Sequence, residues 1–257
     1  MKQLIRKTIE EFTASYAHSS DTGWEKPLVA FASANDPLFA KLKELASPTH
    51  ELPQGFLSEA RTVITYFLPF ADQVIENNKK GRFSSQTWGE AYIETNKLIA
   101  DLNRYLQEKL IHQGYQAVFV PATHNFDEKT LLSDWSHRSA AYIAGLGTFG
   151  LNHMLITERG CCGRIGSLVT DLELPPTLRY KRELCLYKND GSCGECAKKC
   201  FNEALTENNL DKHKCYEMCL ANADRLNSLE SIADVCGKCL VEVPCSTAIP
   251  ARENKTG

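Results

Sequence analysis

The cysteines constrain this chain more than any other feature. Nine of its eleven cysteines follow residue 184, and two pairs there have the form C-x2-C, Cys193–Cys196 and Cys236–Cys239. Each pair is followed within a few residues by one more cysteine, Cys200 or Cys245. Thiolates at such spacings are typical ligands of iron–sulfur clusters or zinc. The pattern therefore predicts a chain that wraps around metal and acts as an electron carrier or a reductase.

The spacing indicates two clusters whose ligands cross over. Bacterial two-cluster proteins use the run C-x2-C-x2-C-x3-C-P, in which the fourth cysteine ligates the other cluster. The segment from Cys193 to Cys200 reproduces the last three positions of this run, although Phe201 replaces the proline. Cys185 takes the place of the first cysteine, displaced by an insertion. We expect one cluster on Cys185, Cys193, Cys196 and Cys245, and a second on Cys200, Cys215, Cys236 and Cys239.

Two alternatives to this assignment stay open. Cys219 follows Cys215 by four residues, so either can be the ligand if this stretch is helical. Two C-x2-C pairs can also form a four-cysteine zinc site. However, the segment between the pairs is longer than in a usual zinc ribbon, and zinc would leave four further cysteines unused. The pattern favours iron–sulfur clusters over zinc.

Composition places the chain among globular proteins without a nucleic-acid or membrane specialisation. Hydrophobic residues make up 43% and charged residues 24%, and the net charge is −3. A dedicated nucleic-acid binder usually has a basic excess. The N-terminus lacks the apolar core of a signal peptide, and no apolar run approaches the length of a membrane span. We expect a cytoplasmic protein, and thiols stay reduced in that compartment, so clustered cysteines act there as metal ligands.

The first ~180 residues have the pattern of a mixed α and β domain, of the α+β or α/β class. Apolar periodicity predicts helices over 3–17, 86–113 and 136–144, the last capped by Gly145, and strands over 61–68, 115–120, 154–157 and 165–170. Pro175-Pro176 is the predicted boundary, which gives domains 1–176 and 177–257. Apolar periodicity fades after this boundary, so folding of the second domain is expected to depend on metal.

Two further motifs carry alternative interpretations. The segment Gly145–Gly150 matches G-x-G-x-x-G, but a predicted helix precedes it, whereas a dinucleotide site needs a strand there. It can instead be a helix cap, or a loop whose backbone lies against a large flat ligand. Cys161-Cys162 lies outside the cluster pattern. The simpler interpretation is that both cysteines pack as small buried apolar side chains. The alternative is a redox role or a contact with a cofactor.

Three parts of the sequence together resemble the epoxyqueuosine reductase family, a relative of the reductive dehalogenases. They are Trp135–Gly150, Gly166–Leu172 and the order of the cysteines from Cys193 to Cys245. The resemblance implies a nitroreductase-like α/β domain that binds cobalamin, followed by a ferredoxin-like domain with two [4Fe-4S] clusters. It also implies that electrons pass through the clusters to the corrinoid. The residues expected to contact the corrinoid are Gly145, Leu146, Gly147, Thr148 and Phe149.

The chain also departs from this family. The family's proton-donating aspartate belongs to an Asp-[Ser/Thr]-Ala-Pro stretch, and by register from the glycine turn this chain has Leu131 at that position. The sequence ends soon after Cys245, without the helical-repeat domain that helps to hold tRNA in the family. Together with the acidic net charge, this argues against tRNA as the substrate. We expect a small-molecule substrate and an electron donor such as ferredoxin or flavodoxin.

The candidates for the proton-handling group are Asp134, His137 and Arg138. On a helix, Asp134 would share a face with both of the others, and a histidine can supply a proton near pH 7. An ordinary helix start with an ion pair is the alternative. The leading functional hypothesis is a cobalamin-dependent iron–sulfur reductase. The alternatives are a ferredoxin-type electron carrier without its own catalytic cofactor, a reductase with flavin in place of cobalamin, and a structural zinc module.

Overall fold

The computed structural model describes residues 1–18, 20, 22–121 and 126–251. The chain forms two compact units that interleave along the sequence. The first unit contains residues 1–70, 93–146 and 163–179. The second contains residues 71–92 and 147–162 together with the chain from residue 180 onward. The division into domains 1–176 and 177–257 stays a prediction, since two earlier segments pack with the cysteine-rich part.

The first unit is built on a four-stranded sheet in the order β1-β2-β8-β3, in which every neighbouring pair is antiparallel. The strands are β1 (Leu28–Ser33), β2 (Thr62–Pro69), β8 (Gly163–Thr170) and β3 (Ala117–Phe119). Ile64 on the central strand β2 stands opposite Phe31 of β1 and Leu168 of β8. The register therefore gathers large apolar side chains on one face of the sheet.

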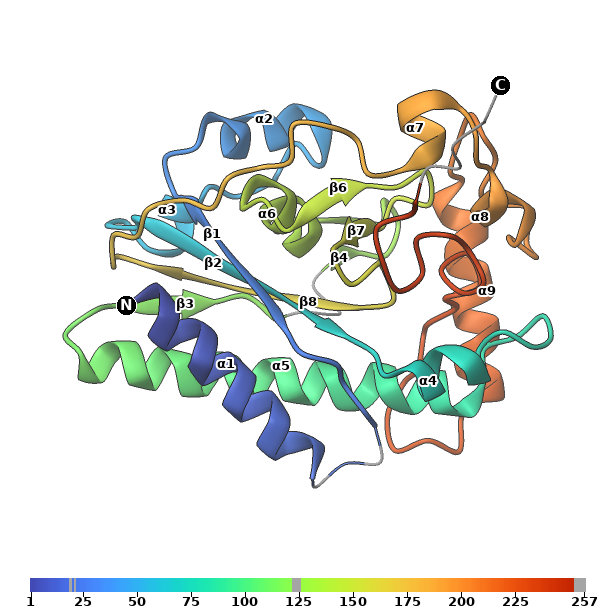
Figure 1. Cartoon of the computed structure of the whole chain (residues 1–257), viewed down its shortest axis with the longest axis horizontal. Helices are drawn as coiled ribbons and strands as arrows, with labels where there is room; N and C mark the ends of the chain where they lie inside the picture. Colours follow the sequence, from blue (N-terminus) through green and yellow to red (C-terminus); the bar gives the residue numbers. More distant parts are fainter. Residues whose placement is uncertain (19, 21, 122–125, 252–257) are drawn as a thin grey trace. The chain divides into compact units, whose positions relative to one another are not determined.

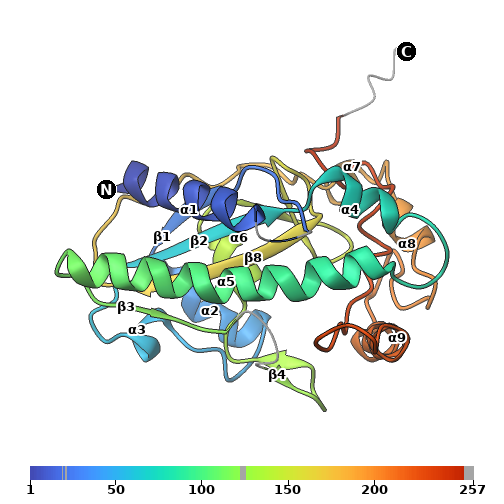
Figure 2. The ribbon, with the colours of Figure 1, turned by 90° about the horizontal axis from the view of Figure 1, so that it is seen from below.

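Helices cover both faces of this sheet (Figures 1 and 2). One face carries Ile64, Tyr66 and Leu68 of β2, which pack with apolar residues of α1 (Lys2–Ala17) and α5 (Gln86–His112). The other face packs against α6 (His137–Ile143). Every residue of β2 is buried as a result. A strand covered on both faces has a continuous apolar sequence, in contrast to the alternation of a half-exposed strand.

The remaining elements of the first unit are short. They are α2 (Pro37–Leu45), α3 (Pro53–Phe56) and the hairpin of β4 (Phe126–Asp127) with β5 (Leu132–Ser133). The side chain of Asp36 caps α2 by accepting a hydrogen bond from the Leu38 N–H at 3.0 Å. Ser136 caps α6 in the same way through the Ser139 N–H at 3.1 Å. Both caps fix where the chain turns into a helix.

The second unit contains little regular structure. Its helices are α4 (Asp72–Asn77), the first residues of α5, α7 (Leu186–Asp190), α8 (Glu195–Lys198) and α9 (Lys212–Arg225). Its strands β6 (Gly147–Phe149) and β7 (Leu155–Thr157) form an antiparallel pair. Buried Asn222 of α9 accepts a hydrogen bond from the Ser84 N–H at 2.9 Å, which ties α9 to the segment before α5. Loops that carry cysteines make up most of the rest.

The helices and strands predicted from apolar periodicity are confirmed, with ends that differ by at most two residues. The mixed α and β class is also confirmed, but the sheets are antiparallel throughout, which places the fold on the α+β side of the prediction. Residues 215–219 are helical, within α9. Over the described residues, no helix is long and apolar enough to cross a membrane.

Candidate functional site

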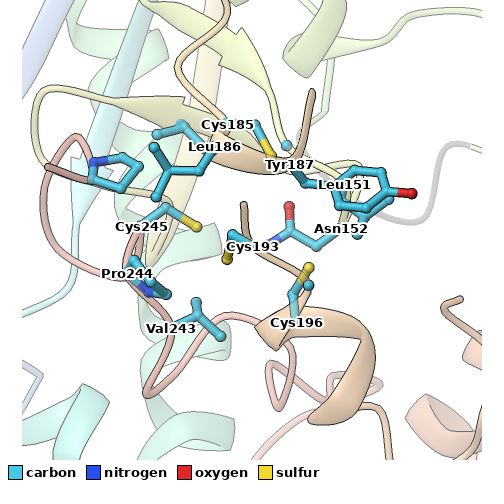
Figure 3. A pocket seen from close by; sticks show the side chains of 14 residues that line it. Leu151, Asn152, Cys185, Leu186, Tyr187, Cys193, Cys196, Val243, Pro244 and Cys245 are labelled. Atoms are coloured by element: carbon cyan, nitrogen blue, oxygen red, sulfur yellow. The ribbon is translucent and has the colours of Figure 1, made fainter. Parts of the chain in front are cut away.

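A pocket in the second unit brings together the four cysteines predicted to hold the first cluster. Cys185, Cys193, Cys196 and Cys245 all line it, and Figure 3 shows their sulfur atoms directed toward one shared space. The space measures about 350 Å3 including its open side. Its remaining wall is mostly apolar, from Leu151, Ile156, Leu186, Val243, Pro244 and Pro250. An apolar wall excludes water from whatever the thiols bind.

Short local structures position these four thiols. Cys185 is the N-cap residue of α7, and Gly191 ends this helix in the left-handed conformation, with φ 73°. Glycine adopts the left-handed conformation without strain, so the chain reverses direction at Gly191. This reversal brings Cys193 back beside Cys185. Cys196 lies in α8. Cys245 is held in a turn in which the Ser246 hydroxyl donates to the Leu240 carbonyl at 2.7 Å.

The electrostatics of this first set favour a positively charged occupant. Burial, followed by the proximity of the other three thiols of the set, raises the pKa of the Cys196 thiol to about 12. Four thiolates therefore cannot gather here without compensating cations. Over the described residues, no three His, Cys, Asp or Glu side chains converge closely enough to bind one metal ion. The four sulfur atoms line one shared space.

The second set of predicted ligands also lies together. Burial raises the pKa of the Cys236 thiol to about 11, and the nearby thiols of Cys215 and Cys200 contribute to this shift. Burial likewise raises the pKa of Cys239, with Cys236 and Cys215 as its strongest neighbours. Gly237, with φ 73°, turns the chain between the two cysteines of the C-x2-C pair. These contacts place all four thiols within electrostatic range of one another.

Cys219 is a fifth thiol beside the second set. It lies one turn after Cys215 on α9. The neighbouring Cys215 thiol, followed by burial, raises the pKa of Cys219. The helical geometry required for either residue to serve as the ligand is therefore present, and the choice between them stays open.

The two sets are nested along the sequence. All of the second set lies in the chain segment between Cys196 and Cys245, which both line the first pocket. The first set is therefore completed only after the chain has passed through the second.

The cysteine pattern did not mark two further residues that lie near these sets, Lys238 and Asn152. Lys238 lies inside the C-x2-C pair, is only 2% exposed, and donates from Nζ to the carbonyl oxygens of Asn78 at 2.6 Å and Lys80 at 2.9 Å. Burial lowers the pKa of this amine. Asn152 lines the first pocket and donates from Nδ2 to the Cys239 carbonyl at 3.2 Å. The position of Lys238 between two ligands is a signal that the sequence offered.

His137, a candidate for proton handling, is buried in the first unit with both ring nitrogens engaged. Nε2 lies 3.1 Å from the Pro121 carbonyl, which can only accept, so Nε2 carries the proton. Nδ1 then accepts from the Ser167 hydroxyl at 2.8 Å, while Ser167 accepts from the Trp135 indole N–H at 2.9 Å. Burial lowers the pKa of His137 to about 4, so the ring is neutral at pH 7. This arrangement favours a positioning role over proton donation.

Asp134 and Arg138 do not share a helical face, because α6 begins only at His137. Asp134 is exposed; its carboxylate accepts from the Thr49 hydroxyl at 2.5 Å and its carbonyl accepts from the Glu51 N–H at 2.7 Å. Arg138 is exposed on α6. A catalytic role for any of the three residues stays a prediction, and the helical-face argument for it does not hold.

Leu131 occupies the position where the family resemblance places an acid. It ends the loop between β4 and β5 in the left-handed region, with φ 54°. Asp127 organises this loop: its carboxylate accepts from the backbone N–H groups of Lys129 and Thr130. A leucine at positive φ is uncommon, so the hairpin imposes a conformation that this side chain does not favour.

The glycine turn, predicted to contact a cofactor, is packed against the chain itself. Gly145 has φ 86°, and the N–H of Leu146 reaches the Ala141 carbonyl at 2.9 Å, so α6 ends in a Schellman motif. A Cβ on Gly145 would lie 2.8 Å from the Leu178 carbonyl oxygen, and one on Gly147 only 2.0 Å from that of Ile156. Neighbouring backbone thus explains both glycines without a ligand. The helix cap was one of the two interpretations that the sequence allowed.

The comparisons with known proteins bear on the fold. No protein-family model matches the sequence, and no curated protein matches it significantly. The epoxyqueuosine reductase from Streptococcus thermophilus is similar in structure, with a TM-score of 0.60 at 16% identity over 96% of this chain and 66% of that one. An epoxyqueuosine reductase solved with a tRNA stem loop gives 0.56 at 18% identity, over 94% and 66%.

Reductive dehalogenases share the same fold. One whose structure suggests a mechanism for B12-dependent dehalogenation has a TM-score of 0.53 at 16% identity, over 89% of this chain and 30% of that one. This chain therefore spans just under two thirds of the length of the epoxyqueuosine reductases and less than a third of the dehalogenase. The resemblance to both groups indicated by the sequence is confirmed at the level of the fold.

Proposed function

We propose that this chain is an iron–sulfur reductase in which two [4Fe-4S] clusters deliver electrons to a corrinoid that reduces a small substrate. The observation that carries the proposal is the convergence of Cys185, Cys193, Cys196 and Cys245 on one largely apolar pocket. Cys245 lies far along the sequence from the other three. Their meeting around a space, beside a second such set, is the arrangement that a polynuclear cluster requires.

The protein's own groups have defined tasks in this proposal. The eight thiols hold the clusters, with Cys219 as the alternative to Cys215. The apolar wall of the first pocket keeps water away, and Lys238 places a buried positive charge beside the second set, where reduction adds negative charge. When bound, the clusters supply one-electron transfer. The zinc alternative is less well supported, because a single ion needs its ligands around one point.

The corrinoid part of the proposal is supported by the fold shared with a B12-dependent dehalogenase. A bound corrinoid would supply the strongly reducing cobalt that acts on the substrate. The turn Gly145–Phe149 offers weaker support, because Gly145 and Gly147 are both explained by neighbouring backbone. This packing favours a second candidate, an electron-transfer protein without its own catalytic cofactor. We infer that the partners are a small-molecule substrate and a ferredoxin or flavodoxin donor.

Cluster binding is tested by anaerobic reconstitution with iron and sulfide, followed by metal analysis and EPR of the reduced protein. We expect iron and sulfide for two [4Fe-4S] clusters per chain. Cys196→Ser should lose one cluster and Cys200→Ser the other, while Cys162→Ala, which alters no predicted ligand, should keep both. Zinc in place of iron, or loss of both clusters in each serine variant with a folded chain, would contradict the assignment.

The corrinoid is tested on the cluster-loaded protein by titration with hydroxocobalamin and a reductant. We expect tight binding, with a cobalt EPR signal that differs from that of free cobalamin. Cluster-loaded protein that binds no corrinoid, but transfers electrons to an acceptor dye, would replace the reductase with the electron-transfer candidate. A flavin titration under the same conditions separates the flavin alternative.

A further inference from the structure

The loop between α4 and α5 presents positive charge to solvent. Lys79, Lys80 and Arg82 lie within four consecutive residues, interrupted only by Gly81, which has φ 69° and open space where a Cβ would stand. Figure 1 shows this loop, drawn in teal, extending beyond α9. Among the described residues, Lys79 pairs with Glu76, whereas no acidic side chain pairs with Lys80 or Arg82. Both of these side chains belong to exposed residues.

Arg225, the last residue of α9, adds a further cation beside this loop. Its guanidinium lies over the ring of Phe83, 4.2 Å from the centroid, and the guanidinium of Arg82 lies 6.0 Å from the same centroid. The face of an aromatic ring attracts cations, so Phe83 holds the two arginines together despite their mutual repulsion. The basic patch formed in this way consists of Lys79, Lys80, Arg82 and Arg225.

Hydrogen bonds attach the loop of the basic patch to the chain around Cys236. Nδ2 of Asn78 and the hydroxyl of Ser84 both donate to the Cys236 carbonyl, at 3.1 and 2.8 Å. Nζ of Lys238 donates to the Asn78 and Lys80 carbonyls at 2.6 and 2.9 Å. The side chain of Lys80 takes no part in these bonds. A molecule that binds the basic patch therefore lies beside a predicted ligand of the second set.

The basic patch is a local exception in an acidic chain. The net charge of the protein is −3, so an anionic partner is attracted only where cations gather within a Debye length. Acidic residues adjoin the edges of the patch, since Glu76 pairs with its first lysine and Asp224 precedes the arginine of α9. The excess positive charge therefore falls on Lys80 and Arg82.

We propose that the basic patch is the docking surface for a small acidic electron-carrier protein, which delivers electrons to the group held by the second set. The proposal rests on the proposed function, because it needs an electron acceptor beside Cys236. Each encounter passes one electron from the reduced carrier to this acceptor, and no bond forms or breaks. Opposite charges on the two surfaces speed the association and orient it.

RNA is the other anionic partner that such a surface could attract. Four cations on one loop and one helix end suit a compact acidic face better than an extended phosphate backbone. A carrier also gains from lying beside Cys236, because the electron enters there, whereas a phosphate backbone gains nothing from this position.

The experiment is stopped-flow mixing of reduced flavodoxin, a small acidic carrier, with the oxidised, reconstituted full-length protein. The rate of loss of the iron–sulfur absorbance should fall as salt rises, because salt screens the attraction. The double variant Lys80→Gln, Arg82→Gln should lower this rate about tenfold at low salt and flatten its salt dependence. The matched control is Lys181→Gln, Arg182→Gln, which removes the same two charges at exposed positions of the same unit. It should leave the rate near that of the wild type.

The outcomes separate docking from the function on which it rests. If the protein takes up no iron, both proposals fail. If clusters form and dithionite reduces them, but neither flavodoxin nor a two-cluster ferredoxin does so, only the docking proposal is overturned. Equal loss of rate in the two double variants would reveal an effect of net charge alone and would also overturn it.

A tRNA stem loop, followed by fluorescence anisotropy, tests the other partner. We expect weak binding that the two double variants change equally. Tight binding of this RNA that only Lys80→Gln, Arg82→Gln abolishes, with unchanged flavodoxin rates, would assign the basic patch to RNA and overturn the proposal.

Discussion

Substitution of His137 by glutamine should flatten the dependence of folding stability on pH. The buried imidazole has a pKa of about 4, against an ordinary value of 6.5 for histidine. Because the folded state disfavours the protonated ring, stability is complete above pH 6.5 and is lost as the pH falls through the interval down to about 4. His137→Gln keeps an N–H that can reach the Pro121 carbonyl but removes the titrating group.

The magnitude follows from these two values. At pH 5.0 an unfolded histidine is almost fully protonated, whereas the folded one is still largely neutral. Each pKa unit corresponds to about 1.4 kcal/mol, so between pH 7.5 and pH 5.0 the wild type should lose about 2 kcal/mol through this ring alone. The His137→Gln variant should not lose this increment. Any other group that titrates is common to both proteins and cancels in the difference.

The assay is anaerobic urea unfolding at several pH values between 5.0 and 7.5. The difference in unfolding free energy between wild type and His137→Gln should change by about 2 kcal/mol over this range, in the direction that favours the variant at low pH. Ser167→Ala is the matched control, because it removes the hydrogen bond to Nδ1 but keeps the imidazole. It should be less stable at every pH with the slope of the wild type. Parallel curves for His137→Gln and the wild type would refute the reasoning.

Three further predictions concern stability. Trp135→Phe removes the indole N–H bond to Ser167 and part of a buried ring, so it should cost more than about 1 kcal/mol in urea unfolding. Gly160→Ala should lower the thermal midpoint and the iron content more than Gly191→Ala. Both glycines have positive φ, but only at Gly160 would an added Cβ meet neighbouring backbone. Equal effects of the two substitutions would contradict the close approach of the backbone at Gly160. Lys238→Met strips two backbone carbonyls of their buried donor and should cost about 2 kcal/mol, measured by thermal unfolding.

Much of the first unit could be predicted from the sequence because local signals and packing agree there. The apolar spacing of α5 and the continuous apolar run of β2 directly reflect the face or faces that each element buries. The strand β1 was missed, because its short apolar run carries no clear period. The antiparallel direction was also missed, since a strand buried on both faces has the same apolar pattern in either kind of sheet.

The candidate site likewise has parts that the sequence predicted and parts that it did not. Cysteine spacing grouped the four thiols that line the first pocket, and their role as cluster ligands stays a prediction. The contact between Cys161 and Cys245 could not be predicted, since it depends on how two distant loops approach across Gly160. The helical face proposed for Asp134 failed because α6, capped by Ser136, begins at His137, three residues later than that argument required. Spacing cannot determine such starts without the cap geometry.

The nesting of the two thiol sets has a consequence for how the protein is loaded. On the proposed assignment, closing the first site alone ties off a loop of roughly fifty residues, from Cys196 to Cys245. If the second site is already closed, the free length shrinks to roughly ten residues, and the entropic cost falls by about 1.4 kcal/mol. Filling one site should therefore tighten the other about tenfold, without any contact between them. A sample with half its iron would then contain mainly full and empty molecules, and few that hold a single cluster.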